Sequence, residues 1–181
     1  ITVQNRALKQ LLWVGMGSIS MFFAGLTSAY IVRKGEGNWV EFVLPEWFWY
    51  STITIVLSSA ILILAQQNIK KDKSIFSLVL GVLVLGLLFT FFQFNGWNEL
   101  TSKGIYLTGK GSNVAGSFLY ILTLAHLVHL IGGLIALLVT AINAKRKKYS
   151  SENYLGLEIA SIYWHFLSIL WVYLFCFLTY L

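Results

Sequence analysis

Apolar residues in this sequence gather into five long runs, and this pattern limits the fold more than any other feature. The runs cover residues 11–32, 47–67, 75–94, 115–144 and 156–181. A helix needs about twenty residues to cross a hydrocarbon core of about 30 Å, at about 1.5 Å per residue. Lipid offers no hydrogen-bond partners to the backbone, so each run must satisfy its own backbone as a helix. The sequence therefore predicts an all-α fold, a single transmembrane domain of five helices over residues 1–181.

Composition and pattern argue against the main alternatives. Charged residues make up 11% of the chain and hydrophobic residues 57%, whereas soluble domains carry roughly a quarter charged residues. Residues 78–88 and 130–139 lack the alternation that β-barrel strands need. The first run is too long for the apolar core of a signal peptide, so we expect it to remain in the mature protein. The chain begins at Ile1 rather than Met, so we expect residues before it.

Lysine and arginine residues predict the orientation, because positively charged loops tend to stay cytoplasmic. One side of the predicted bundle carries most of them: Arg6, Lys9, Lys70, Lys71, Lys73, Lys145, Arg146, Lys147 and Lys148. The other side carries Arg33, Lys34, Lys103 and Lys110. We therefore expect the N-terminus in the cytoplasm and Leu181 outside. The net charge of +6 fits this topology and attraction to lipid headgroups better than nucleic-acid binding.

Ionisable residues within the predicted helices are the first candidates for function, because they are costly in lipid. They are His126 and His129 in the fourth run, and Glu158 and His165 in the fifth. At 100° per residue, His126, His129, Gly133 and Thr140 share one side of the fourth helix. Glu158, Ser161, His165 and Ser168 form a similar stripe on the fifth. We expect the two stripes to face each other or a neighbouring subunit.

Three kinds of chemistry fit these residues. Histidines on membrane helices can hold a metal or haem, and Glu158 with the histidines can form a proton relay. In the third interpretation they bond across helices, or to lipid headgroups and a partner. The only cysteine, Cys176, allows no internal disulfide and no multi-cysteine metal site. We expect no metal at the histidines, because no further cysteine, histidine or carboxylate pattern converges with them.

Two motifs on the last two predicted helices resemble those of a known family. Residues 126–133, His-Leu-Val-His-Leu-Ile-Gly-Gly, resemble the H-x-x-H-x-x-x-G stretch of subunit III of haem-copper oxidases, the cytochrome c oxidase family. Residues 158–166, Glu-Ile-Ala-Ser-Ile-Tyr-Trp-His-Phe, followed by Trp171, resemble its E-x-A-x-x-Y-W-H-F stretch. Met21-Phe22-Phe23 with Ala29-Tyr30 is similar to the first helix that short members of the family retain. The resemblance covers the whole chain, in a five-helix bacterial form.

The resemblance implies an accessory subunit of a proton-pumping terminal oxidase, part of an enzyme but without a catalytic centre. It implies packing on subunit I, contact with subunit II and a respiratory supercomplex, bound phospholipid, and a place in the bacterial cytoplasmic membrane. Haem and copper are then expected in the partner subunits and no cofactor in this chain. The residues expected to make structural, lipid or partner contacts are His126, His129, Gly133, Glu158, Trp164, His165 and Trp171.

Three positions depart from the family pattern. Ile19 stands where members commonly have a Glu, Ser168 where an Asp often stands, and Tyr154 where a His often stands. These departures weaken any proton-handling role. The missing first helix pair of the long form removes one wall of its lipid-holding cleft. Two alternative functions stay open at this point: the equivalent subunit of a nitric oxide reductase, and an independent haem-binding or quinol-binding membrane protein.

Overall fold

Five helices make up the chain in the computed structural model, which describes residues 3–37, 39, 44–110, 112–149 and 152–180. They are α1 (Val3–Gly35), α2 (Glu46–Lys70), α3 (Phe76–Ser102), α4 (Val114–Lys145) and α5 (Leu155–Tyr180). Each is long enough and apolar enough to cross a membrane. No strand occurs in the described residues. The prediction of an all-α, five-helix membrane fold is confirmed.

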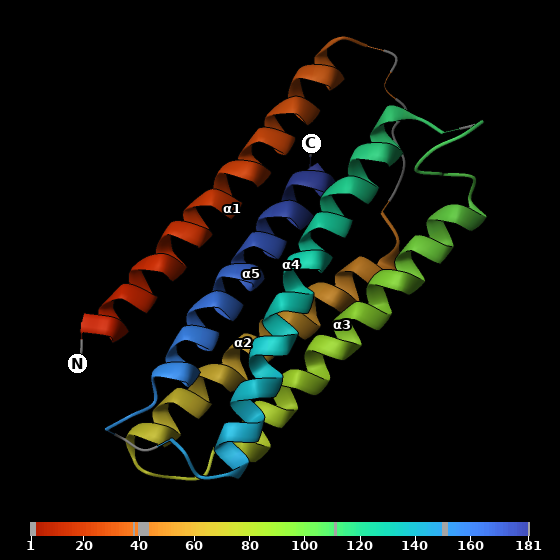
Figure 1. Cartoon of the computed structure of the whole chain (residues 1–181). Helices are drawn as coiled ribbons and strands as arrows, with labels where there is room; N and C mark the ends of the chain where they lie inside the picture. Colours follow the sequence, from red (N-terminus) through yellow and green to blue (C-terminus); the bar gives the residue numbers. More distant parts are fainter. Residues whose placement is uncertain (1–2, 38, 40–43, 111, 150–151, 181) are drawn as a thin grey trace.

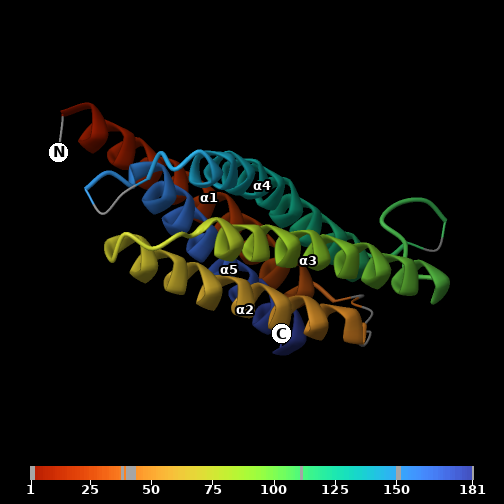
Figure 2. The ribbon, with the colours of Figure 1, turned by 90° about the horizontal axis from the view of Figure 1, so that it is seen from below.

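Four of the helices close into a ring. Helix α2 packs on α3, α3 on α4, α4 on α5, and α5 returns to α2. Within the described parts of the chain, α1 packs only on α4 and α5 and has no contact with α2 or α3. Figure 1 shows α1 along the outside of the bundle, next to α5, and Figure 2 shows the same arrangement from below. Helix α5 is therefore the element that joins the ring to α1.

The ends of the bundle separate the basic residues as the sequence predicts. The start of α1 lies at the same end as the α2–α3 and α4–α5 connections, and α5 ends at the opposite end (Figure 1). The second residue of each of these connections, Asp72 and Lys147, lies in the left-handed region with φ of 56°. The structure contains no membrane, so the cytoplasmic assignment of this end stays a prediction.

Helix α3 is longer than predicted. The third predicted run ends at residue 94, but residues 95–102 continue the helix to Ser102. Hydropathy falls there, yet Leu100 is fully buried, and Trp97 Nε1 donates a hydrogen bond of 3.0 Å to Thr123 Oγ1 on α4. These contacts hold the helix beyond its most apolar part. Helix α1 also begins earlier, at Val3 rather than Leu11, and the predicted end at residue 181 lies outside the described residues.

Candidate functional site

Three hydrogen bonds between side chains join α5 to α2. Trp164 Nε1 donates to Ser58 Oγ over 2.8 Å. Trp171 Nε1 donates to Thr52 Oγ1 over 2.9 Å. Ser59 Oγ donates to Ser168 Oγ over 2.6 Å. In lipid, such bonds contribute to helix association, because apolar faces gain little from one another there. Both predicted tryptophans thus have their polar atom bonded inside the chain.

Trp164 also fills the centre of the ring. Its side chain is fully buried and lies against two glycines, one on α3 and one on α4. A Cβ built on Gly86 of α3 would lie 2.8 Å from Trp164 Cη2. A Cβ built on Gly133 of α4 would lie 3.2 Å from Trp164 Cε3. The absence of side chains at these two glycines is what makes room for the indole, which gives Gly133 a packing role.

His126 is fully buried between α4, α3 and α5. Its Nε2 lies 2.9 Å from the backbone oxygen of Leu167. A carbonyl oxygen only accepts, so Nε2 carries the proton and donates. The ring centroid lies 5.8 Å from that of Phe89 and 5.3 Å from that of Trp171. Nδ1 has no hydrogen-bond partner among the described residues. This histidine therefore links α4 to the backbone of α5 inside an aromatic cage.

His129 faces a different neighbour. Its Nδ1 donates to the backbone oxygen of Ala125 over 2.7 Å, and its ring centroid lies 5.7 Å from that of Phe23 on α1. The hydroxyl of Tyr163 on α5 donates to the backbone oxygen of His129 over 2.9 Å. The two histidines of the motif therefore serve two interfaces, with α5 at His126 and with α1 at His129.

Glu158 lies in the first turn of α5, as predicted. Its Oε1 forms an ion pair of 2.7 Å with Lys9 Nζ of α1, and the two side chains are 32% and 31% exposed. A polar partner on another helix or a lipid was expected for Glu158, and in this structure Lys9 of α1 is its partner. One turn or two along α5, Ser161 Oγ and His165 Nε2 are buried and have no partner within the described residues.

The two polar stripes of α4 and α5 do not face each other. On α5, Glu158 meets α1 and Ser168 meets α2. On α4, Gly133 meets Trp164 and Leu167, which lie outside the α5 stripe. The expectation that the stripes face one another is wrong, because α5 has three neighbours and its stripe is divided between α1 and α2. Contact with a neighbouring subunit stays a prediction.

The described residues contain no group of three or more histidine, cysteine, aspartate or glutamate side chains that would hold a metal ion. Cys176 is free and exposed. The three ionisable side chains also bond to three different partners. His126 bonds to Leu167, His129 bonds to Ala125, and Glu158 bonds to Lys9. Among the described residues, these bonds do not connect Glu158 to either histidine.

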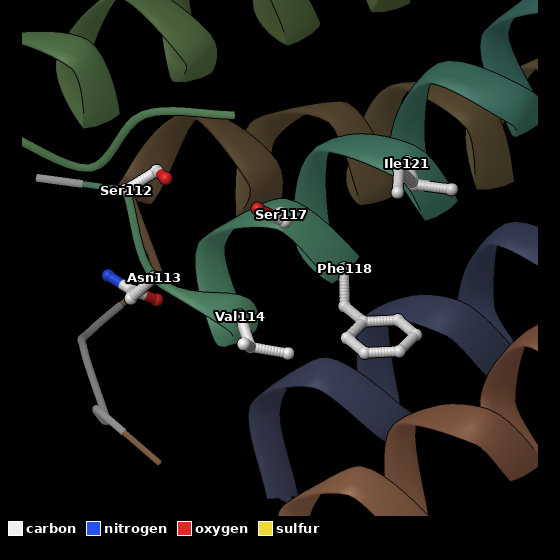
Figure 3. A pocket seen from close by; sticks show the side chains of 6 residues that line it. All are labelled: Ser112, Asn113, Val114, Ser117, Phe118 and Ile121. Carbon is white, nitrogen blue, oxygen red and sulfur yellow. The ribbon is translucent and has the colours of Figure 1, made fainter. Parts of the chain in front are cut away.

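One pocket lies at the N-terminal end of α4, away from these residues. Ser112, Asn113, Val114, Ser117, Phe118 and Ile121 line it (Figure 3). Asn113 Oδ1 accepts a 2.7 Å bond from the backbone nitrogen of Gly116 and so caps the helix. Ser117 Oγ donates to the backbone oxygen of Leu107 over 2.7 Å. The polar groups of the pocket therefore hold the start of α4 in place.

Comparison with known proteins identifies the family. A family model described as cytochrome c oxidase subunit III matches residues 44–181. A probable cytochrome c oxidase subunit 3 of Nocardia farcinica is 30% identical over 175 residues, which cover 90% of this chain and 82% of that protein. The cytochrome c oxidase subunit 3 of Thermostichus vulcanus is 27% identical over 173 residues, covering 87% and 79%.

The chain belongs to the cytochrome c oxidase subunit III family. It is thus a multi-pass membrane protein and an accessory subunit of an oxidase complex. The family model begins at residue 44 and covers the ring of α2 to α5. The alignment to the Nocardia relative covers 90% of the chain.

The structure accounts for the departures from the family's motifs. Ile19, in the place of the family's Glu, packs against an apolar cluster of Phe23, Leu122, Leu170 and Leu174. Ser168 accepts from Ser59 and donates to the backbone oxygen of Trp164 over 3.0 Å. Tyr154 packs against the main apolar core. Each position therefore holds a residue that suits packing or a neutral hydrogen bond.

Four residues that bond to the predicted site residues were not identified from the sequence: Lys9, Thr52, Ser58 and Ser59. Gln93, which is fully buried on α3, was not identified either. The hydroxyls had no signal, because serine and threonine are common in membrane helices. Gln93 had one, since an amide between the phenylalanines at the end of the third apolar run is an unusual polar group. Lys9 was assigned to topology alone.

Proposed function

We propose that this subunit packs against subunit I of a cytochrome c oxidase and supports its stability and proton uptake, with no redox centre of its own. The observation that carries this proposal is that three motif residues form hydrogen bonds within this chain. His126, Trp164 and Trp171 each bond to another helix, so these bonds stabilise the bundle. Haem and copper then belong to the partner subunits.

The outer face of α1 supports a helical partner. Leu11, Val14 and Met21 are 68%, 67% and 76% exposed, and a Cβ built on Gly17 or Gly25 would meet nothing within 4 Å. Small residues on an open face let a neighbouring helix approach closely. Subunit I is the main partner in this proposal. Subunit II, a supercomplex and phospholipids are further partners, and the location in this proposal is a bacterial cytoplasmic membrane.

The alternative functions are not favoured. The relatives described above are named for cytochrome c oxidase, which gives no support to a nitric oxide reductase subunit. The family match over residues 44–181 likewise gives no support to an independent haem-binding or quinol-binding protein.

Removing the subunit from the purified complex tests the proposal. We expect the haem spectrum and the initial rate of electron transfer to persist. The number of turnovers before inactivation should fall, and proton uptake near neutral pH should slow, because a supporting surface and its lipids are gone. An oxygen-consumption trace and an optical spectrum, taken before and after removal, measure both. An unchanged trace would contradict the supporting role.

Metal analysis tests the statement about redox centres separately. The chain, separated from its partners, should contain no metal in stoichiometric amount. A one-to-one metal content, or the loss of a haem band when the subunit is removed, would show that this chain carries a cofactor and would overturn that part of the proposal.

A further inference from the structure

Two fully buried side chains of the ring carry polar atoms that no described residue satisfies. Gln93 of α3 has no partner for either its amide nitrogen or its amide oxygen, and His126 of α4 has none for Nδ1. Burying such an atom without a hydrogen bond is costly, and more so where the surroundings are lipid and apolar side chains. Buried polar groups in native proteins almost always have a partner, which is often an ordered water molecule.

The packing of α3 on α4 places Gln93 beside His126. Four residues before Gln93, the Phe89 ring packs on the His126 ring at 5.8 Å. Four residues after it, Trp97 Nε1 donates to Thr123 Oγ1. Residues four apart lie on the same side of a helix, and so do Thr123 and His126, three apart on α4. Gln93 therefore lies between the two contacts, on the side of α3 that faces His126.

A water molecule can both donate and accept hydrogen bonds, so it can bridge the unsatisfied atoms of Gln93 and His126. Nε2 of His126 donates to Leu167, so in the neutral ring Nδ1 is a bare acceptor. The Gln93 amide offers two hydrogens and one acceptor oxygen. A direct bond from Gln93 to Nδ1 would still leave the amide oxygen without a partner. A water molecule can donate one hydrogen to Nδ1 and the other to the amide oxygen, so that both acceptors have a partner.

We propose that Gln93 and His126 form an internal polar site that binds one ordered water molecule. The rings of Phe89 and Trp171 flank His126, so the water is held between aromatic walls and makes the two to four bonds that buried waters usually make. Through it α3 is tied to α4, and through Nε2 of His126 the tie extends to the backbone of α5. This site is separate from the surface that would meet subunit I.

A double-mutant cycle on the assembled complex tests the coupling. Gln93→Met and His126→Phe each keep roughly the size of the side chain and remove its polar atoms. Each single variant should lower the midpoint of thermal dissociation by roughly 2 to 4 °C, the shift expected when about one hydrogen bond is lost in a chain of this size. In the double variant the midpoint should fall by clearly less than the sum of the two single falls. The reason is that neither replaced side chain then leaves the other with an unsatisfied polar atom.

Thr90→Val provides the matched control. Thr90 is also on α3, but its hydroxyl donates to the backbone oxygen of Gly86 in its own helix, so its loss should add to that of His126→Phe. Additive losses for Gln93→Met with His126→Phe would overturn the proposal. If the variants do not assemble, an electron-density or cryo-EM map of the wild-type complex that resolves ordered water decides instead. Density for a water between Gln93 and Nδ1 supports the site, and its absence there overturns it.

Discussion

Single residues at the centre of the ring show why the tryptophans matter. Trp164 has its nitrogen bonded to Ser58 and its ring pressed between Gly86 and Gly133. The indole of Trp164 therefore limits how closely α3, α4 and α5 can approach one another. A change as small as one methyl group at either glycine acts on three helices, because protein interiors are packed as densely as organic crystals.

Gly86→Ala tests this packing. The added methyl group would lie 2.5 Å from Leu134 Cδ2 and 2.8 Å from Trp164 Cη2, so we expect a loss of about 1 to 3 kcal/mol through overpacking. Gly81→Ala on the same helix is the control. A Cβ there meets nothing within 4 Å, so alanine should gain up to about 1 kcal/mol of helix propensity. Thermal unfolding in detergent measures both, and equal effects would contradict the packing argument.

Sequence reasoning found the residues of the site but not their partners. The histidines, Glu158 and the tryptophans stand out because polar or large groups are rare in an apolar run. What each one bonds to depends on how the helices are rotated and which lie next to each other. His126 and His129, three residues apart, point to α5 and α1 respectively. Neither outcome follows from spacing alone, because the order of helices around the bundle is a tertiary property.

Among the elements, α1 is held least firmly, and its ion pair is open to test. Lys9→Gln and Glu158→Gln should each loosen α1 from α5, and the cost should be at most about 1 kcal/mol because the pair is about one-third exposed. Exchanging the two charges, Lys9→Glu with Glu158→Lys, should restore the attachment only in part. Glu158 also benefits from the N-terminus of α5, where a lysine is unfavourable. The temperature at which the subunit leaves the complex is the readout.

Glu36→Gln provides a control for these variants. Its pair with Arg33 spans three residues at the end of α1, at 4.0 Å, and does not join two helices. Its loss should therefore leave the attachment of α1 unchanged. An equal effect at both pairs would mean that net charge, and not the link between α1 and α5, determines retention.

The elements themselves were largely predictable. Runs of apolar residues locate all five helices, since a hydrocarbon core demands a minimum length. The ends of the helices were less predictable, because hydropathy indicates which residues lie in the hydrocarbon core and not where the helix ends. Residues 95–102 remain helical after hydropathy falls, and Leu100 and Trp97 keep packing on the ring. A helix that extends into the interface region needs a tertiary partner, which the sequence does not display.

At the scale of the whole molecule, the separation of basic residues predicts orientation. Single cysteines at Ser74, in the α2–α3 connection, and at Thr108, in the α3–α4 connection, can be introduced into a Cys176→Ser background. Both positions are exposed. In right-side-out vesicles a membrane-impermeant maleimide should label the cysteine at Thr108 at once, and that at Ser74 only after permeabilisation. The reverse labelling order would contradict a cytoplasmic N-terminus.

The ring of four helices has a consequence for how the protein is made. In the described part of the chain α2 to α5 pack in a closed ring, and α1 packs only on α4 and α5. We therefore expect α1 to be able to dock on the other four helices as a separate piece. A gene cut into two reading frames, one ending after Gly37 and one starting at Leu44, should yield two polypeptides that find each other in the membrane. Co-purification of a tag on one with the other measures this complementation, and a charge-reversed Lys9 should weaken it.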